Sequence, residues 1–318
     1  MESSYRIAAV IINYKTPELC LQAVRSLYME LDAQLDSIVV VDNCSEDGSF
    51  QFLQQALATE DWSGYIEIMQ SDFNGGFSYG NNFVMSRINA QAYLLLNSDA
   101  LVKPEAVKTM WKVMQDDPKI GLLGPLVEDE EGNTQESSFV DRSPWNEFLD
   151  TAKTGLFTKL FAYLGVRDVA MSTDKLIDKP DWLSFVCVLI RGSAYQQIGP
   201  MDDGYFMYKE DNDYCRRTRA KGWGIRYLSE AHIIHLNNGW SSKETARKPS
   251  FFYQSRTRYF RKYYGFSGFI LANVLWTLGR LIHFLREILQ RKPVSVAACA
   301  WRDIWTFAYG SKPINYYK

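Results

Sequence analysis

Three carboxylates stand within four residues in the run Glu210-Asp211-Asn212-Asp213. Acidic residues are common in the first turn of a helix, where they interact favourably with the helix dipole, and one or two of the three fit that role. Crowded carboxylates also raise one another's pKa, which suits a general base near neutral pH. The cluster therefore predicts a proton acceptor, with helix stabilisation as the alternative for each residue alone.

Asn97-Ser98-Asp99 directly follows an apolar run at 94–96 that predicts a buried strand. Amide and carboxylate oxygens at the end of a strand suit Mg²⁺ or Mn²⁺ that bridges a diphosphate. Asp99 could instead cap a helix that we expect to begin near Pro104. These residues alone leave both explanations open.

Two further segments have the residue types of a nucleotide site. Asp42 follows the apolar run 38–41, and a carboxylate at a strand end can accept hydrogen bonds from a base or a ribose. Asn74 precedes Gly75 and Gly76, and adjacent glycines allow a backbone to approach a ligand closely. An ordinary glycine-rich turn has the same composition. Ser45 is expected to cap the next helix.

The chain has three histidines. His232 and His235 end a β-like segment, and a neutral imidazole there is able to complete a metal site. We expect His283, and more weakly His232, to be structural.

The elements that must position these residues alternate between strand and helix. Strands are expected at 7–12, 38–41, 65–69 and 93–96, and helices at 19–31 (with Pro17 in the first turn), 50–57 and 104–114. This alternation predicts a doubly wound α/β sheet, whose ligands bind at the carboxyl ends of the strands. A further strand is expected at 182–191 and a helix at 214–221 that Gly222 ends, with little regular structure over 128–178.

Composition excludes several classes of protein. The 318 residues are 47% hydrophobic and 23% charged with a net charge of −2, which is typical of a folded globular chain and not of a disordered, collagen-like or coiled-coil one. The average balance also argues against a nucleic-acid-binding protein. Five scattered cysteines fit a reducing compartment. The first residues lack a signal-peptide pattern, so we expect a cytoplasmic location.

The C-terminal part is basic and contains an amphipathic segment. Residues 254–318 hold eleven Lys and Arg against two Asp and Glu. Residues 266–289 have helical apolar spacing with a wide apolar face, flanked by basic and aromatic residues, which is typical of a helix lying in an anionic membrane surface. Packing on the rest of the protein and a homodimer interface are the alternatives. No run reaches 18 uninterrupted apolar residues, so we do not expect a membrane span.

Six sequence runs, taken together and in order, indicate a protein family more specifically than any one of them does. The runs IINYK, VVVDNCSEDGS, NGGFSYGNN, YLLLNSDA, YKEDNDYCRR and HLNNGWS occur in this order over about residues 6–265. Together they resemble inverting glycosyltransferases of family 2, in particular the bacterial rhamnosyltransferase-like subgroup. The resemblance implies the A-type fold, with a Rossmann-like nucleotide-sugar half (about 1–127) and an acceptor half (128–265) around one mostly parallel sheet, followed by a helical segment (266–318).

The resemblance also implies roles for residues. Asp211 would be the catalytic base and Glu210 a residue that orients the acceptor. Asp99 would hold the metal, Mg²⁺ or Mn²⁺, helped by His235. The donor would be bound by the residues Asn13, Tyr14, Asp42, Asn74, Gly75, Asn97 and Asp99. Asn97 stands where the family's D-x-D element has its first carboxylate, which lowers the negative charge available to a metal.

The function implied is transfer of rhamnose or another hexose from a nucleoside-diphosphate sugar, dTDP-rhamnose or a UDP-sugar. The acceptor would be a saccharide or a polyprenyl-diphosphate-linked saccharide in cell-envelope polysaccharide synthesis, at the inner face of the membrane. The alternative is a non-catalytic sugar-nucleotide or glycan-binding protein on the same fold. A nucleotidyltransferase is disfavoured because no glycine-rich loop follows the first strand. A processive synthase is disfavoured because several membrane spans would be needed.

Overall fold

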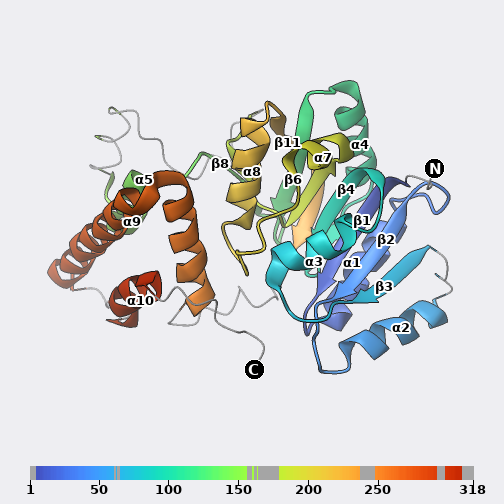
Figure 1. Cartoon of the computed structure of the whole chain (residues 1–318), viewed down its shortest axis with the longest axis horizontal. Helices are drawn as coiled ribbons and strands as arrows, with labels where there is room; N and C mark the ends of the chain where they lie inside the picture. The colour runs from blue at the N-terminus through green and yellow to red at the C-terminus, as the bar shows by residue number, and fades with distance from the viewer. Residues whose placement is uncertain are drawn as a thin grey trace.

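A computed structural model describes residues 5–60, 62, 65–155, 160, 163, 179–236, 248–291 and 298–309. A large β-sheet with helices on both faces lies beside a separate group of helices (Figure 1). In spatial order the strands are β3 (Ile66–Gln70), β2 (Ser37–Asp42), β1 (Tyr5–Asn13), β4 (Ala90–Asn97), β10 (Cys187–Arg191), β6 (Ile120–Glu128), β11 (Gly224–His235) and β5 (Ala100–Val102), and β7 (Thr134–Gln135) pairs with β6.

The sheet is mostly parallel, as expected. Strands β1 to β4 are parallel to one another, and so are β6 and β11. Strand β10 runs antiparallel to both β4 and β6, and β5 runs antiparallel to β11. One expected strand, 182–191, is in fact two: β9 (Trp182–Leu183) pairs with β8 (Ser138–Phe139) outside the main sheet. Residues 184–186 between β9 and β10 line a cavity.

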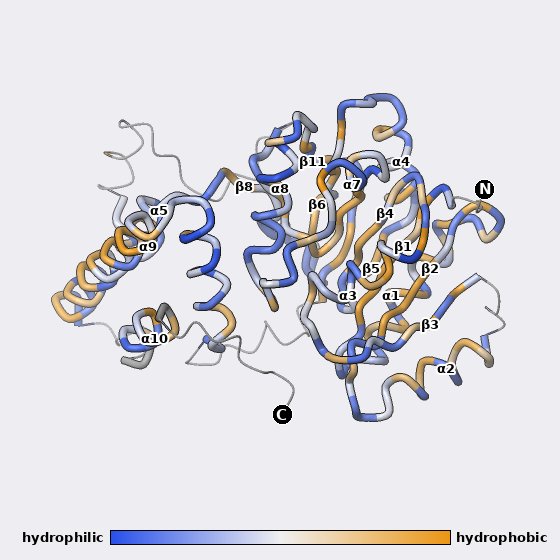
Figure 2. Tube along the Cα trace, in the orientation of Figure 1, coloured by the Kyte–Doolittle hydropathy of each residue, from blue (hydrophilic) through white to orange (hydrophobic). Residues whose placement is uncertain are grey.

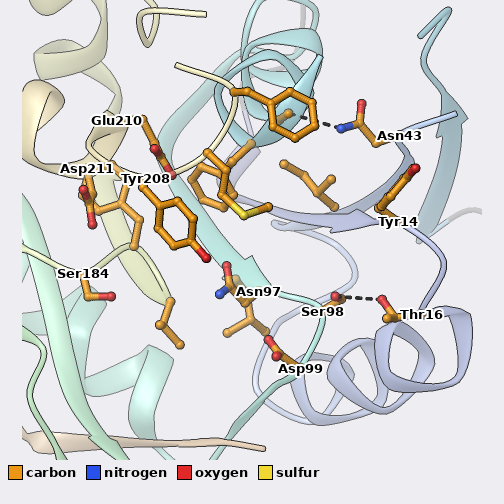
Figure 3. A pocket seen from close by; sticks show the side chains of 18 of the residues that line it. Tyr14, Thr16, Asn43, Asn97, Ser98, Asp99, Ser184, Tyr208, Glu210 and Asp211 are labelled. Atoms are coloured by element: carbon orange, nitrogen blue, oxygen red, sulfur yellow. Dashed lines mark hydrogen bonds between the residues drawn. The ribbon is translucent and has the colours of Figure 1, made fainter. Parts of the chain in front are cut away.

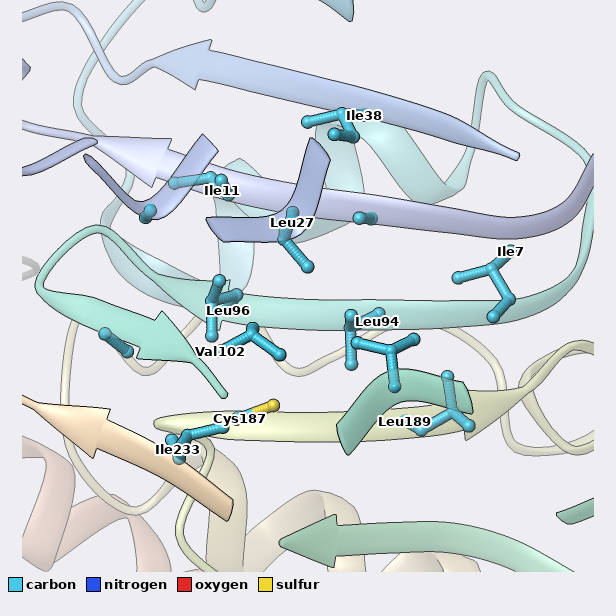
Figure 4. Close-up of a cluster of buried hydrophobic side chains, with 14 of the residues drawn as sticks. Ile7, Ile11, Leu27, Ile38, Leu94, Leu96, Val102, Cys187, Leu189 and Ile233 are labelled. Atoms are coloured by element: carbon cyan, nitrogen blue, oxygen red, sulfur yellow. The ribbon is translucent and has the colours of Figure 1, made fainter. Parts of the chain in front are cut away.

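Helices cover both faces of the sheet. α1 (Pro17–Tyr28), α2 (Ser49–Thr59) and α4 (Ala106–Asp116) pack on one face with Ile7 and Ile11 of β1 (Figure 4). α3 (Gly76–Met85), α7 (Gly192–Ile198) and α8 (Glu210–Ala220) pack on the other face with Ala8 and Val10. Because both faces are covered, β1 has a nearly unbroken apolar sequence, and Figure 2 shows hydrophobic residues concentrated along the central strands.

Several expected boundaries need correction. Pro17 begins α1 as expected, but Ser45 does not cap α2; Gly48 is the N-cap residue, and the Ser45 hydroxyl donates to Asp42 Oδ1 instead (2.5 Å). Helix α8 begins at Glu210 and not at residue 214, so the acidic cluster is its first turn. The segment 128–178 is more regular than expected, since its described residues include β7, β8 and α5 (Pro144–Ala152). The expected division near residue 127 stays a prediction.

The second helical group contains α5, α9 (Ser250–Leu289) and α10 (Ala298–Tyr309) (Figure 1). Helix α9 bends at Gly265, whose φ of 68° is left-handed, and this divides it into a proximal half (250–264) and a distal half (266–289). The distal half coincides with the amphipathic helix expected from the sequence. By length and composition, α9 is the one helix in the described part of the chain that could cross a membrane.

Candidate active site

A cavity of about 510 Å³ lies at the carboxyl ends of β1, β2 and β4. The strand register brings these ends to one edge of the sheet, since Asn13 pairs with Asp42 and Ile12 with Asn97. In Figure 3, Glu210 and Asp211 lie on one side of the cavity and Tyr14 on the other, with Asn97 between them. The expected site residues that line it are Tyr14, Asn74, Asn97, Asp99, Glu210, Asp211 and His235.

Asp99 and His235 are adjacent because of the pairing between β5 and β11. Ala100 lies opposite His235, and the Leu236 N–H donates to the Asp99 carbonyl (2.9 Å). His235 Nε2 is 3.4 Å from Asp99 Oδ1, and His235 Nδ1 is 3.1 Å from Gln135 Oε1. In the tautomer whose Nδ1–H donates to this amide oxygen, Nε2 presents its lone pair toward Asp99. A lone pair and a carboxylate that face each other fit a cation placed between them.

The donor set fits a divalent metal only if other ligands complete it. Within the described ranges, no three His, Cys, Asp or Glu side chains converge. Mg²⁺ is commonly held by one or two carboxylates together with substrate phosphates, and Mn²⁺ also favours oxygen ligands, whereas imidazole is a better ligand for zinc or copper. Asp99 and His235 would therefore be the protein's ligands, with oxygens of a donor diphosphate completing the shell.

The chain turns sharply before α8. Tyr208 and Lys209 both adopt left-handed backbone conformations, with φ of 70° and 72°. Such conformations cost about 1–3 kcal/mol each for residues other than glycine and cluster at functional sites. Here the turn places Glu210 and Asp211, the first residues of α8, on the cavity wall.

The two carboxylates differ in environment. Burial, and then the charge of Asp211, raise the pKa of Glu210, whose Oε2 has no hydrogen-bond partner in the described structure. Burial raises the pKa of Asp211, while the Asn212 N–H donates to its Oδ1 (2.7 Å) and opposes this rise. Asp211 is thus the more readily ionised of the pair, and Glu210 the better proton donor.

Three expected donor residues do not line the cavity: Asn13, Asp42 and Gly75. Asp42 is fully buried, and its carboxylate accepts from Asn13 Nδ2 (2.7 Å), from the Ser45 hydroxyl and from Gln70 Nε2 (3.2 Å). This network fastens the ends of β1, β2 and β3 together. Direct contact of these three residues with a donor stays a prediction.

Other cavity residues were not foreseen. Asn43 Nδ2 donates to Asn74 Oδ1 (2.9 Å) and to the Gly76 carbonyl (3.2 Å), so it orders the glycine-rich turn. Tyr208 stacks on Phe251 with ring centroids 5.9 Å apart. The aromatic residues in the segment 205–208 could have indicated from the sequence that Tyr208 lies at the site. Phe251 comes from α9, and no sequence pattern around it indicates a cavity residue.

The glycine-rich turn and the segment before α8 touch each other. Gly76 has a φ of +80°, and a Cβ added to it would lie 1.9 Å from the Phe206 carbonyl oxygen. That same oxygen accepts from the Phe77 N–H (2.9 Å). Glycine is therefore required where the two sides of the cavity meet.

The remaining histidines are paired. His232 Nδ1 lies 2.9 Å from Glu128 Oε1, and His283 Nε2 lies 3.1 Å from Glu287 Oε1. Both fit the structural role expected of them. Residues 237–241 of the HLNNGWS run lie outside the described residues.

The family model described as "Glycosyltransferase like family 2" matches residues 5–265. Among curated proteins, the chain is 25% identical over 233 residues to the low-salt glycan biosynthesis hexosyltransferase Agl10 of Haloferax volcanii, covering 72% of this chain and 66% of that one. It is 24% identical over 258 residues to the N-acetylglucosaminyl-diphospho-decaprenol L-rhamnosyltransferase of Mycobacterium tuberculosis, and this match covers 76% of this chain and 79% of the relative. It is 25% identical over 168 residues to the rhamnosyltransferase WbbL of Escherichia coli, and this match covers 50% of this chain and 60% of the relative.

Solved structures with a similar fold include GalNAc-T7 with UDP, GalNAc and Mn²⁺ (TM-score 0.58, 12% identity, 96% of this chain and 55% of that chain). They also include the mannosyltransferase PcManGT of Pyrobaculum calidifontis with GDP-Man and Mn²⁺ (TM-score 0.59, 11% identity, 96% of this chain and 86% of that chain). The chain thus spans just under two thirds of the Haloferax volcanii hexosyltransferase and about half of GalNAc-T7. At these identities the likeness shows the fold, and it confirms the expected A-type architecture.

Proposed function

This chain belongs to the glycosyltransferase-like family 2, and from that premise we propose that it is a metal-dependent, inverting hexosyltransferase with a nucleoside-diphosphate sugar as donor. One observation carries the proposal: a single cavity holds the Asp99–His235 pair and, on another wall, the Glu210–Asp211 pair. The first pair suits a metal-bound diphosphate, and the second suits proton transfer.

The proposed chemistry is one direct displacement. Asp211 accepts the proton of an acceptor hydroxyl as that oxygen attacks the anomeric carbon, and the bond from that carbon to the diphosphate breaks on the opposite face. The configuration inverts and the nucleoside diphosphate leaves. Glu210, when protonated, donates a hydrogen bond that orients the acceptor. A divalent cation held by Asp99 and His235 would neutralise charge on the leaving diphosphate.

The relatives support a narrower choice of substrates. Two of them are named rhamnosyltransferases, which favours dTDP-rhamnose as donor over a UDP-sugar. The mycobacterial relative is named for a diphospho-decaprenol-linked sugar, which favours a polyprenyl-diphosphate-linked saccharide as acceptor. We place the reaction in cell-envelope polysaccharide synthesis at the cytoplasmic face of the membrane.

The test is a donor panel of dTDP-rhamnose, UDP-glucose and GDP-mannose, each with and without Mg²⁺ or Mn²⁺. Binding is read from the unfolding temperature, and turnover from release of nucleoside diphosphate. One donor should stabilise the protein only with metal, by about 2.7 kcal/mol at 100 times its Kd. Asp99→Ala should remove the metal-dependent part, whereas Asp116→Ala, an exposed aspartate on α4, should keep it.

Two results would count against the proposal. Equal donor binding with and without metal would contradict the proposal that Asp99 and His235 hold a metal ion. Metal-dependent binding without any turnover on lipid-linked acceptors would favour a non-catalytic sugar-nucleotide-binding protein, for which Asn97 in place of a carboxylate is the supporting observation.

A further inference from the structure

The distal half of α9 has the reverse of the polarity expected for a helix on a soluble protein. Over residues 269–289, which are all described, each exposed side chain is aliphatic. Polar side chains of the same segment, Asn273, His283 and Glu287, are buried. A helix on a water-exposed surface places these types the other way round. Figure 2 shows the hydrophobic residues of α9 at the edge of the molecule away from the sheet.

The exposed residues form one continuous stripe with spacings of three and four. We call this the aliphatic stripe, and its members, each between 39% and 51% exposed, are Leu271, Val274, Leu278, Leu281, Leu285 and Ile288. At 1.5 Å per residue it runs for about 25 Å along the helix. An exposed apolar surface of this length marks a docking site.

We propose that the aliphatic stripe docks this protein on an anionic lipid bilayer, with α9 lying in the plane of the membrane. The choice of a bilayer rests on the proposed function, in which the acceptor is lipid-linked. The charges agree with it: Arg261 before the bend and Arg291 after the helix are exposed, and their side chains have no hydrogen bond or ion pair among the described residues. Unpaired cations beside an apolar stripe attract anionic headgroups.

The opposite side of α9 excludes a membrane-spanning arrangement. A Cβ on Gly279 would lie 2.2 Å from Thr151 Oγ1 of α5, so the two helices are in close contact there. Trp305 of α10 donates to the Thr277 hydroxyl (3.3 Å). A spanning helix would have to give up this packing and bring Glu287 into hydrocarbon, which is costly.

The residues beside the stripe argue against a second copy of the chain as its occupant. In paired helices the flanking positions usually carry charges that select the partner. Here those positions hold Leu275, Thr277, Ile282 and Phe284, which carry no charge. Leu275 is buried and packs with Ile282 against α5, and Thr277 bonds to Trp305 of α10, so no charge beside the stripe is available to select a partner helix.

The test is co-sedimentation of the full chain with vesicles of phosphatidylcholine alone or with phosphatidylglycerol, without donor or acceptor. We expect binding to the anionic vesicles that weakens with salt, and at least a tenfold loss of partitioning in Leu278→Glu/Leu285→Glu. The control Met29→Glu/Leu35→Glu changes residues of similar or greater exposure (77% and 48%) in the nucleotide-sugar half and should bind like the wild type.

A fluorophore on Leu281→Cys gives a second readout that does not depend on a doubly charged helix. Its emission should shift to the blue on anionic vesicles, and the same probe on Leu35→Cys should not shift. Undiminished binding by the stripe variant, or a wild-type dimer that the stripe variant converts to monomer without a change in vesicle binding, would overturn the proposal. Donor-induced stabilisation, measured separately, shows whether the sugar-nucleotide site is correct, so the two failures are distinguishable.

Discussion

At the scale of single residues, Asp211 carries the proposed chemistry. Its carboxylate lies on the cavity wall, and the Asn212 N–H holds one oxygen in place (2.7 Å). Glu210 beside it is more deeply buried and lacks a partner for one oxygen among the described residues. This difference supports the proposed roles, with Asp211 as the base and Glu210 as a hydrogen-bond donor.

Asp211→Asn should lower kcat by about 10²–10⁴, because an amide cannot take up the acceptor proton. Donor binding, read from the unfolding temperature, should stay within a few-fold of the wild type. Glu210→Gln, which still donates a hydrogen bond, should lose much less, and Asp116→Asn should lose nothing. Near-normal transfer by Asp211→Asn would show that another group is the base.

The pH dependence of transfer follows from the pKa of Asp211. Burial raises this pKa, and the base works only when ionised, so kcat/KM should fall as the pH is lowered. The midpoint of the fall should lie near pH 6, well above the ordinary aspartate pKa of about 3.9. A profile of kcat/KM against pH from 4 to 9 measures it, and a midpoint at or below 4 would mean that burial does not act on the base.

At the scale of elements, the cavity depends on contacts between segments far apart in the chain. The Phe206 carbonyl accepts from the first turn of α3 and leaves no room for a side chain at Gly76. Left-handed residues at 208 and 209 then turn the same segment into α8. The position of the base is therefore tied to the glycine-rich turn.

Gly76→Ala should destabilise the protein by about 2–4 kcal/mol and weaken donor binding, because its Cβ would lie 1.9 Å from the Phe206 oxygen. Gly132→Ala is the matched control, since Gly132 has a similar φ (+84°) but nothing within 4 Å of an added Cβ. Urea unfolding measures both. Equal losses would mean that only backbone strain matters, and not the contact between the two segments.

At the scale of the whole molecule, buried charges connect α5 to α9. Glu147 of α5 lies 2.8 Å from Arg256 of α9 and 2.9 Å from Arg142. Burial by itself would raise the pKa of Glu147, but the charges of Arg256 and Arg142 outweigh it and lower the pKa to about 2. The attachment of the proximal half of α9 to α5 thus includes an ionised, buried carboxylate.

A lowered carboxylate pKa stabilises the folded state above the unfolded pKa, near 4.3, and this stabilisation is lost as the pH falls toward 2. We expect Glu147 to contribute about 3 kcal/mol of acid-sensitive stability over that range. Urea unfolding between pH 7 and pH 3 should show a smaller loss for Glu147→Gln than for the wild type. Glu67→Gln, an exposed control on β3, should lose as much stability between pH 7 and pH 3 as the wild type. Identical losses of stability in all three proteins would show that Glu147 does not contribute this acid-sensitive stability.

The sequence alone determined the local features of this protein. Unbroken apolar runs such as 7–12 predicted buried parallel strands, because a strand covered on both faces has no polar side. The polar residues after these strands could be grouped in advance, because parallel strands end at one edge of a sheet. The order of the motifs predicted the family and the A-type fold, which the comparisons confirm.

Features that depend on contacts between distant segments could be read only from the fold. It buried Asp42 in a network while bringing Asp99 to His235 through the pairing of β5 with β11. It placed Phe251 of α9 against Tyr208, and it turned the polar side of the distal half of α9 inward. Periodicity shows that a helix has two faces, but which face is covered depends on the elements that pack against it. That choice lies in the arrangement of α5, α9 and α10, which no local pattern in the sequence contains.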